Sequence, residues 1–173
     1  MSDKGYVHVY TGEGKGKTTA AFGLALRAGG AGLRVYIAQF VKGRAYSELE
    51  AFARFDDLIT IKQYGRGCFI RREPTAEDVA AAQDGLEEVR AVVASCAWDL
   101  VVLDEANIAV LFGLFGVEDL LDLIDSKPPS LELVITGRHA DPRVIERADL
   151  VTEMREVKHY YTRGVQARVG IER

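Results

Sequence analysis

The residue types and spacing in segment 12–19 are suited to binding phosphate. The segment reads Gly-Glu-Gly-Lys-Gly-Lys-Thr-Thr. Glycines allow positive φ angles and bring backbone N–H groups against phosphate oxygens. Lys17 supplies a point charge for those oxygens, and the Thr18 hydroxyl is a suitable ligand for Mg²⁺. The segment therefore predicts a site for a nucleoside triphosphate.

This loop is one residue shorter than the usual nucleotide-binding pattern G-x-x-x-x-G-K-[ST]. Counting back from Gly16, Thr11 occupies the place of the first glycine, and the nearest glycine is Gly12. An apolar strand precedes the loop, and a helix that starts near Gly16 adds its positive dipole end to the site. These neighbours argue against the alternative of a glycine-rich turn with chance lysines. The tighter spacing indicates an unusual pose for the triphosphate.

A second chemical signal is Asp104-Glu105, which directly follows the apolar residues 101–103. Mg²⁺ requires oxygen ligands beside Thr18, and an apolar strand ending in carboxylates is the usual source of them. One acid would ligate the metal, and the other would orient a water or a neighbouring group. The spacing leaves open which acid has which role. The alternative is that both acids simply mark the exit of a strand into solvent.

Basic residues follow two other predicted strands. Arg138 is placed to reach a phosphate or carboxylate, or else is an exposed arginine. Its neighbour His139 fits a turn or cap better than a catalytic base. Lys42 and Arg44 either meet an anionic ligand or are solvated loop charges.

The loop 65–72 has two readings. It places Cys68, Phe69 and Ile70 between glycines and arginines. The loop is either a lid over a flat, partly apolar ligand or a satellite core contact. The locally basic C-terminal stretch from residue 157 either packs over the nucleotide site or finishes the sheet.

Composition excludes several function classes. The chain has 173 residues, a net charge of −4 and two cysteines. The acidic balance argues against a nucleic-acid partner, and the absence of a long apolar run argues against a membrane span. The two cysteines are far apart and lack metal-ligand spacing, so we expect a reduced, cytoplasmic protein. Asp3 and Lys4 lead directly into the first predicted strand, so we expect no signal peptide. Cys96 continues the apolar stripe of a helix and is expected in the core.

Apolar strands alternate with helical patterns along the whole chain. We expect strands at 6–10, 34–41, 59–64, 100–103, 131–136 and 150–154. We expect helices at 18–29, from Thr75 with Asp78 in a capping box, at 117–124 and from Pro142. This pattern predicts one α/β domain over residues 1–173, with a mostly parallel sheet covered by helices on both faces. Ligands bind such sheets at the carboxyl ends of the strands, where the phosphate loop also lies.

Residues 11–23 resemble the shortened loop of the ATP:corrinoid adenosyltransferases, which act on cob(I)alamin and cob(I)yrinic acid a,c-diamide. The likeness continues in order through Arg27 and residues 39–43, 101–105, 135–138, 148–154, 157–159 and 164–172. It therefore covers nearly the whole chain.

The resemblance implies a P-loop fold of the RecA type, usually as a homodimer. It implies that ATP lies reversed in the loop, so that its C5′ faces the corrinoid. Cobalt, reduced to Co(I), would attack C5′ and expel inorganic triphosphate, in adenosylcobalamin biosynthesis or corrinoid salvage. Catalysis would then need placement and electrostatic stabilisation rather than a covalent side-chain nucleophile.

The resemblance also implies roles for individual residues. Lys17 would neutralise charge on the leaving group, and Thr18 with Glu105 would form the environment of Mg²⁺, with Mn²⁺ as an alternative. The residues implied to contact ATP are Gly12, Glu13, Gly14, Lys15, Gly16, Lys17, Thr18, Thr19, Arg27 and Arg138. Cys68, Phe69 and Ile70 occupy the corrinoid loop, where relatives often carry a G-x-G-F-T-W-like sequence. A flavoprotein is the implied reductant of cobalt.

The sequence departs from some relatives at its N-terminus as well. Those relatives carry a longer extension that helps to cover the corrinoid, whereas here the first strand begins almost at once. Two rival functions remain. One is an ordinary RecA-type ATPase, in which an acid after the strand activates water to give ADP and phosphate. The other is a nucleotide-dependent nucleic-acid-binding module, against which the acidic charge weighs.

Overall fold

The computed structural model describes residues 4–43, 47–67 and 73–172, so Arg44, Cys68, Phe69 and Ile70 lie outside the described residues. Its centre is a six-stranded sheet in the order β3-β2-β4-β5-β1-β6, in which every pair of neighbours is parallel. The strands are β1 (Val7–Thr11), β2 (Val35–Phe40), β3 (Ile59–Tyr64), β4 (Leu100–Asp104), β5 (Glu132–Thr136) and β6 (Leu150–Glu153). The expected parallel sheet is confirmed.

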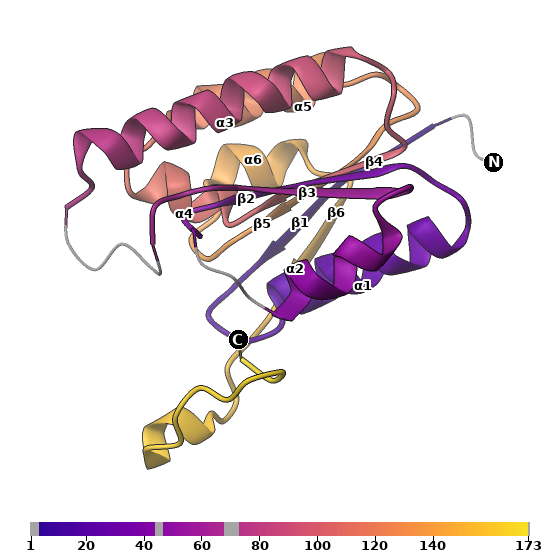
Figure 1. The fold of residues 1–173 in the computed structure, drawn as a ribbon. Helices are drawn as coiled ribbons and strands as arrows, with labels where there is room; N and C mark the ends of the chain where they lie inside the picture. Colours follow the sequence, from indigo (N-terminus) through magenta and orange to yellow (C-terminus); the bar gives the residue numbers. More distant parts are fainter. Residues whose placement is uncertain (1–3, 44–46, 68–72, 173) are drawn as a thin grey trace.

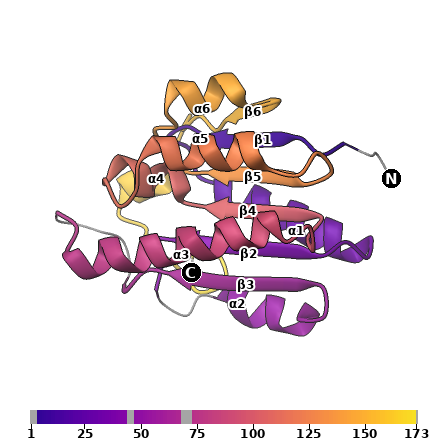
Figure 2. The ribbon, with the colours of Figure 1, turned by 90° about the horizontal axis from the view of Figure 1, so that it is seen from above.

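Helices cover both faces of this sheet (Figures 1 and 2). On one face lie α3 (Ala76–Ala94), α4 (Ala106–Leu111), α5 (Val117–Ser126) and α6 (Pro142–Arg147). On the other lie α1 (Lys17–Gly30) and α2 (Ser47–Phe52). Two short 3-10 turns, η1 (Ala53–Phe55) and η2 (Tyr160–Arg163), complete the order. Each face has its own apolar core, so the chain forms a three-layer α/β fold.

The central strands explain why the sequence shows continuous apolar runs. All six residues of β2 and all five of β4 are buried, because helices pack on both of their faces. At the edge of the sheet, by contrast, all four residues of β6 are exposed. No helix among the described residues is long and apolar enough to cross a membrane.

Strand register brings the site residues together at the carboxyl ends of the strands. Gln39 of β2 is opposite Asp104 of β4, and Thr136 of β5 is opposite Tyr10, which precedes the last residue of β1. Since all these strands are parallel, their carboxyl ends lie together. The phosphate loop that follows β1 therefore meets the residues that end β2, β4 and β5.

Local signals predicted the long helix α3 correctly, but the core position predicted for Cys96, two residues beyond its end, is not observed. Thr75 and Asp78 form the expected capping box, with Asp78 N–H donating to Thr75 Oγ1 at 3.2 Å and Thr75 N–H to Asp78 Oδ2 at 3.0 Å. Cys96 is exposed, so its predicted core position is wrong. The helix ends at Ala94, and Cys96 adopts a left-handed φ of 52°, which takes it off the apolar stripe.

Gly85 allows α3 to pack closely on the sheet. A Cβ atom at this position would lie 2.3 Å from Cγ of Tyr64 on β3, so no larger side chain fits without displacing the ring. Gly23 of α1 is the opposite case, because a Cβ atom there would meet nothing within 4 Å.

We predict that these two glycines respond in opposite directions to alanine. Gly85→Ala overpacks the core and should lower the free energy of unfolding by about 1–3 kcal/mol. Gly23→Ala should raise it by about 0.5–1 kcal/mol, because alanine is the better helix former. Urea unfolding of the two variants measures both changes, and equal stabilities would contradict the close α3–β3 contact.

Candidate active site

The phosphate loop is braced by the chain that follows β6. Gly12 and Gly16 have φ angles of 91° and 118°, in the region that favours glycine. A Cβ atom on Gly12 would lie 2.5 Å from the carbonyl oxygen of Met154, and one on Gly14 2.7 Å from the same atom. The Gly14 N–H donates to that oxygen at 2.6 Å. The loop glycines are thus required by packing as well as by backbone conformation.

The Lys17 ammonium lies over the centre of this loop. Its Nζ donates to the carbonyl oxygens of Gly12 and Gly14, both at 2.7 Å. Burial is the main cause that lowers the pKa of Lys17, and the positive charge of Arg138 adds to it. Lys17 is also the first residue of the 14-residue helix α1, so a positive charge and a helix N-terminus coincide. This combination is suited to a polyanion such as triphosphate.

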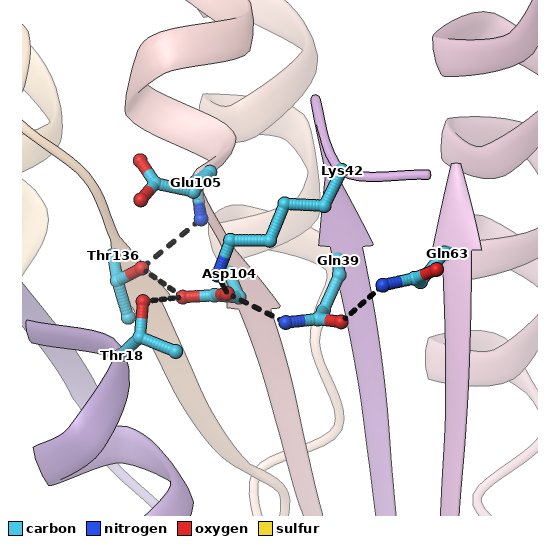
Figure 3. A network of polar contacts seen from close by, with 7 residues as sticks. All are labelled: Thr18, Gln39, Lys42, Gln63, Asp104, Glu105 and Thr136. Atoms are coloured by element: carbon cyan, nitrogen blue, oxygen red, sulfur yellow. Dashed lines mark hydrogen bonds and ion pairs between the residues drawn. The ribbon is translucent and has the colours of Figure 1, made fainter. Parts of the chain in front are cut away.

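Asp104 organises the residues around the loop (Figure 3). Its carboxylate is fully buried and accepts four hydrogen bonds. Oδ1 accepts from the hydroxyls of Thr18 at 2.8 Å and Thr136 at 2.7 Å. Oδ2 accepts from Gln39 Nε2 at 3.1 Å and from Lys42 Nζ at 3.0 Å. A carboxylate has about four lone-pair positions, so Asp104 is fully committed to holding its neighbours.

Glu105 has a different environment from Asp104. Its backbone N–H donates to Thr136 Oγ1 at 3.0 Å, while its carboxylate points away from Asp104 (Figure 3) and lines the cleft described below. Burial is the main cause that raises the pKa of Glu105, and the nearby charge of Asp104 raises it further. The structure therefore distinguishes the positions of the two acids, which their spacing in the sequence left open. Asp104 accepts a hydrogen bond from Thr18, and Glu105 faces the cleft.

A cleft of about 830 Å³ opens above the loop. The predicted site residues that line it are Glu13, Gly14, Lys15, Gly16, Lys17, Thr18, Thr19, Glu105 and Arg138. The carbonyl oxygen of Gly12 accepts a hydrogen bond from Nζ of Lys17, which lines the cleft. Arg138 forms an ion pair with Glu13 at 3.4 Å, and His139 lies beside the same carboxylate in a left-handed turn.

The structure does not bring Arg27 to this cleft. Arg27 is an exposed residue in the last turn of α1. It follows Lys17 by ten residues, which corresponds to about 15 Å along a helix.

Sequence reasoning missed several residues of the site. Gln39 is a fully buried polar side chain in an otherwise apolar strand, and that contrast is the signal that could have identified it. Thr136 is equally buried at the end of β5. The short helix α2 lines the cleft with Ala51, and the C-terminal segment does so with Tyr161 and Ile171. The C-terminal stretch thus packs over the site rather than finishing the sheet.

The donor set at the loop fits a metal ion that arrives with its substrate. Among the described residues there is no group of three or more His, Cys, Asp or Glu side chains that could hold a metal ion by itself. The Thr18 hydroxyl and the Glu105 carboxylate are nevertheless hard oxygen donors on one cleft. Mg²⁺ usually binds proteins through one or two such groups and completes its coordination with substrate phosphates and water.

The fold and the loop define the class of this protein as a nucleotide-binding α/β protein of the P-loop type. A solved structure supports the fold: a KaiC-like protein, PH0186 from Pyrococcus horikoshii, aligns with a TM-score of 0.55 and 15% identity, over 87% of this chain and 72% of that one.

Comparisons with protein families and relatives give a narrower assignment. The family model for ATP:corrinoid adenosyltransferase BtuR/CobO/CobP matches residues 3–173. The corrinoid adenosyltransferase of Pseudomonas aeruginosa is 38% identical over 98% of this chain and 84% of its own length. That of Escherichia coli K12 is 33% identical over 99% of this chain and 87% of its own. The chain belongs to the ATP:corrinoid adenosyltransferase family, and it is an enzyme that uses ATP and a corrinoid.

We predict that the two neighbouring acids differ in their effect on stability. Asp104→Asn leaves the buried ammonium of Lys42 without its carboxylate and should lower the free energy of unfolding by about 3–5 kcal/mol. Glu105→Gln should preserve or raise it at neutral pH. Because burial raises the folded-state pKa of Glu105, its ionised form destabilises the fold above that pKa, and glutamine removes this cost.

Urea unfolding at pH 7 tests both substitutions. Equal losses in the two variants would contradict the division of roles between the acids.

Proposed function

We propose that this enzyme transfers the 5′-deoxyadenosyl group of ATP to the Co(I) of cobalamin or of cob(I)yrinic acid a,c-diamide. The electron pair of Co(I) forms the new bond to C5′, the C5′–O bond breaks, and inorganic triphosphate leaves with that bonding pair. The observation that carries the proposal is the shortened phosphate loop in a chain of this family. The loop has Thr11 where the usual pattern has its first glycine, and its carbonyl oxygens hold the ammonium of Lys17 at the N-terminus of α1. Such a loop suits a triphosphate that leaves intact.

The residues of the cleft have distinct roles in this proposal. The loop residues 12–19 hold the triphosphate, and Lys17 neutralises the charge that develops on it as the C5′–O bond breaks. Lys15 and Arg138 add positive charge from the same cleft. Asp104 orients the Thr18 hydroxyl by accepting its hydrogen bond, so that the lone pairs of the hydroxyl oxygen remain available to a metal ion.

We propose Thr18 and Glu105 as the residues that hold Mg²⁺, with Mn²⁺ as a substitute. The ion would supply further neutralisation of the phosphate charge when bound. Co(I) formation requires a reductant, for which a flavoprotein is the proposed partner, and a homodimer is the proposed assembly. The two cysteines and the absence of a long apolar run favour a cytoplasmic location.

One observation favours a second candidate function. The Glu105 carboxylate faces the cleft and has a raised pKa, which suits a base that activates water. Hydrolysis of ATP to ADP and phosphate is therefore the alternative reaction. A nucleic-acid partner has no comparable support, because the chain carries a net charge of −4.

We predict that the products distinguish the two reactions. Incubation with Mg-ATP and a chemically reduced corrinoid should give inorganic triphosphate and an alkylcobalt corrinoid in equal amounts. The alkylcobalt product is recognised by its light-sensitive absorption spectrum. Without the corrinoid, no ADP should accumulate. Release of ADP at the same rate with and without corrinoid would identify an ATPase instead.

We predict that Lys17 and the metal act in the transfer step. Lys17→Met should lower kcat about 100-fold to 1,000-fold, because it removes a fixed charge aimed at the leaving group. The matched control is Lys62→Met. Lys62 is an exposed lysine of β3, and it is not among the described residues that line the cleft. Chelation of divalent ions should stop the wild-type reaction. A Lys17→Met enzyme with unchanged kcat would refute this role.

A further inference from the structure

The C-terminal segment, residues 155–172, forms one wall of the cleft but lies outside the three layers of the fold. Figure 1 shows it in yellow, beyond the end of β6 and beside the phosphate loop. Tyr161, Ile171 and Glu172 line the cleft. Two hydrogen bonds attach this part of the chain to the phosphate loop. Gly14 N–H donates at 2.6 Å to the carbonyl oxygen of Met154, the residue just before the segment, and Lys15 Nζ donates at 3.3 Å to the carbonyl oxygen of Ile171 within it.

Three side chains close this segment on itself, and we call them the tail latch: Tyr160, Arg168 and Glu172. The Glu172 carboxylate accepts from the Tyr160 hydroxyl, from the backbone N–H of Arg168 at 2.9 Å and from its guanidinium at 3.1 Å. The same guanidinium lies over the Tyr160 ring at 5.1 Å. These contacts hold the pKa of Glu172 down at about 2. The latch joins the two ends of residues 160–172 without support from either apolar core.

The latch fixes two large apolar side chains that remain exposed to the cleft. Tyr161, next to Tyr160, is 70% exposed, and Ile171, next to Glu172, is 56% exposed. Both line the cleft, to which α1 and α2 contribute Phe22 and Ala51. Exposed apolar groups that gather in a cleft mark a binding surface.

The charges in the cleft indicate which part of ATP meets this surface. The cationic residues Lys15, Lys17 and Arg138 suit the triphosphate. The uncharged, aromatic part of ATP is its adenosine, and apolar side chains complement it. A single ATP molecule therefore matches the two kinds of surface within one cleft.

We propose that the tail latch is a positioning device that holds Tyr161 and Ile171 against the adenosine of ATP. Glu172 is its central residue, and it acts through the segment rather than by touching the reacting atoms. The proposal rests on ATP binding with its triphosphate in the phosphate loop.

The test compares Mg-ATP with inorganic triphosphate, which lacks the adenosine. In titration calorimetry, Glu172→Ala and Tyr161→Ala should each raise the Kd of Mg-ATP about threefold to tenfold, the size expected for one lost ring contact. The Kd of triphosphate should stay within about twofold of the wild-type value. The melting temperature should not change, because the segment lies outside both cores. Arg163→Ala, an exposed residue of the same segment, is the matched control.

Each contrary outcome is decisive. Equal losses for Mg-ATP and triphosphate would show that the segment acts on the phosphate loop through Lys15, and would overturn the proposal. Unchanged Kd values would also overturn it, as would a raised KM for the corrinoid alone. Failure of the adenosyl transfer itself is scored separately, by the absence of alkylcobalt product with the wild-type enzyme.

Discussion

A single buried carboxylate, that of Asp104, determines how the elements of this site are placed. A charge without solvent is tolerated only when it is paired and fully hydrogen-bonded. Asp104 meets this condition because it accepts hydrogen bonds from four side chains on different elements. The donors are Thr18 of α1, Gln39 of β2, Lys42 just after β2, and Thr136 of β5. The start of the phosphate-loop helix and the ends of three strands are therefore fixed to one point. A shift of any one of them would break one of the four hydrogen bonds that the buried carboxylate accepts.

Backbone conformation then directs the neighbouring side chains. Val41, Glu105 and His139 all have left-handed φ angles, of 64°, 60° and 56°. They follow β2, β4 and β5, the same strands that surround Asp104. This conformation is unfavourable for residues other than glycine, and such strain is found preferentially at functional sites. Here the left-handed turn at Glu105 makes two consecutive side chains point in different directions. The Glu105 carboxylate faces the cleft, whereas Asp104, the last residue of β4, is fully buried.

This backbone feature also explains what could be predicted from the sequence. Strand β3 has the expected bounds, and the loop glycines and the cap at Thr75 were identified because they depend on local chemistry alone. The separate roles of Asp104 and Glu105 depend on a left-handed turn that no spacing rule reveals. The helices α2 and α4 have six residues each, too few for a periodic pattern. Arg27, taken from the resemblance rather than from spacing, lies away from the cleft.

The phosphate loop and the C-terminal segment form one mechanical unit, and this sharpens the meaning of the missing loop residue. The N–H of Gly14 is already used by Met154, and the carbonyls of Gly12 and Gly14 are used by Lys17. An extra residue between Gly12 and Gly14 would disturb the fit of both glycines against the chain after β6, where a Cβ atom already cannot be accommodated. The short loop therefore links the proposed triphosphate site to the segment that carries Tyr161 and Ile171. In the reaction proposed above, cobalt is the nucleophile, so placement and charge stabilisation are the contributions left to the protein. The proposed contacts to the triphosphate and to the adenosine would supply both, because together they fix C5′ between two held ends of ATP.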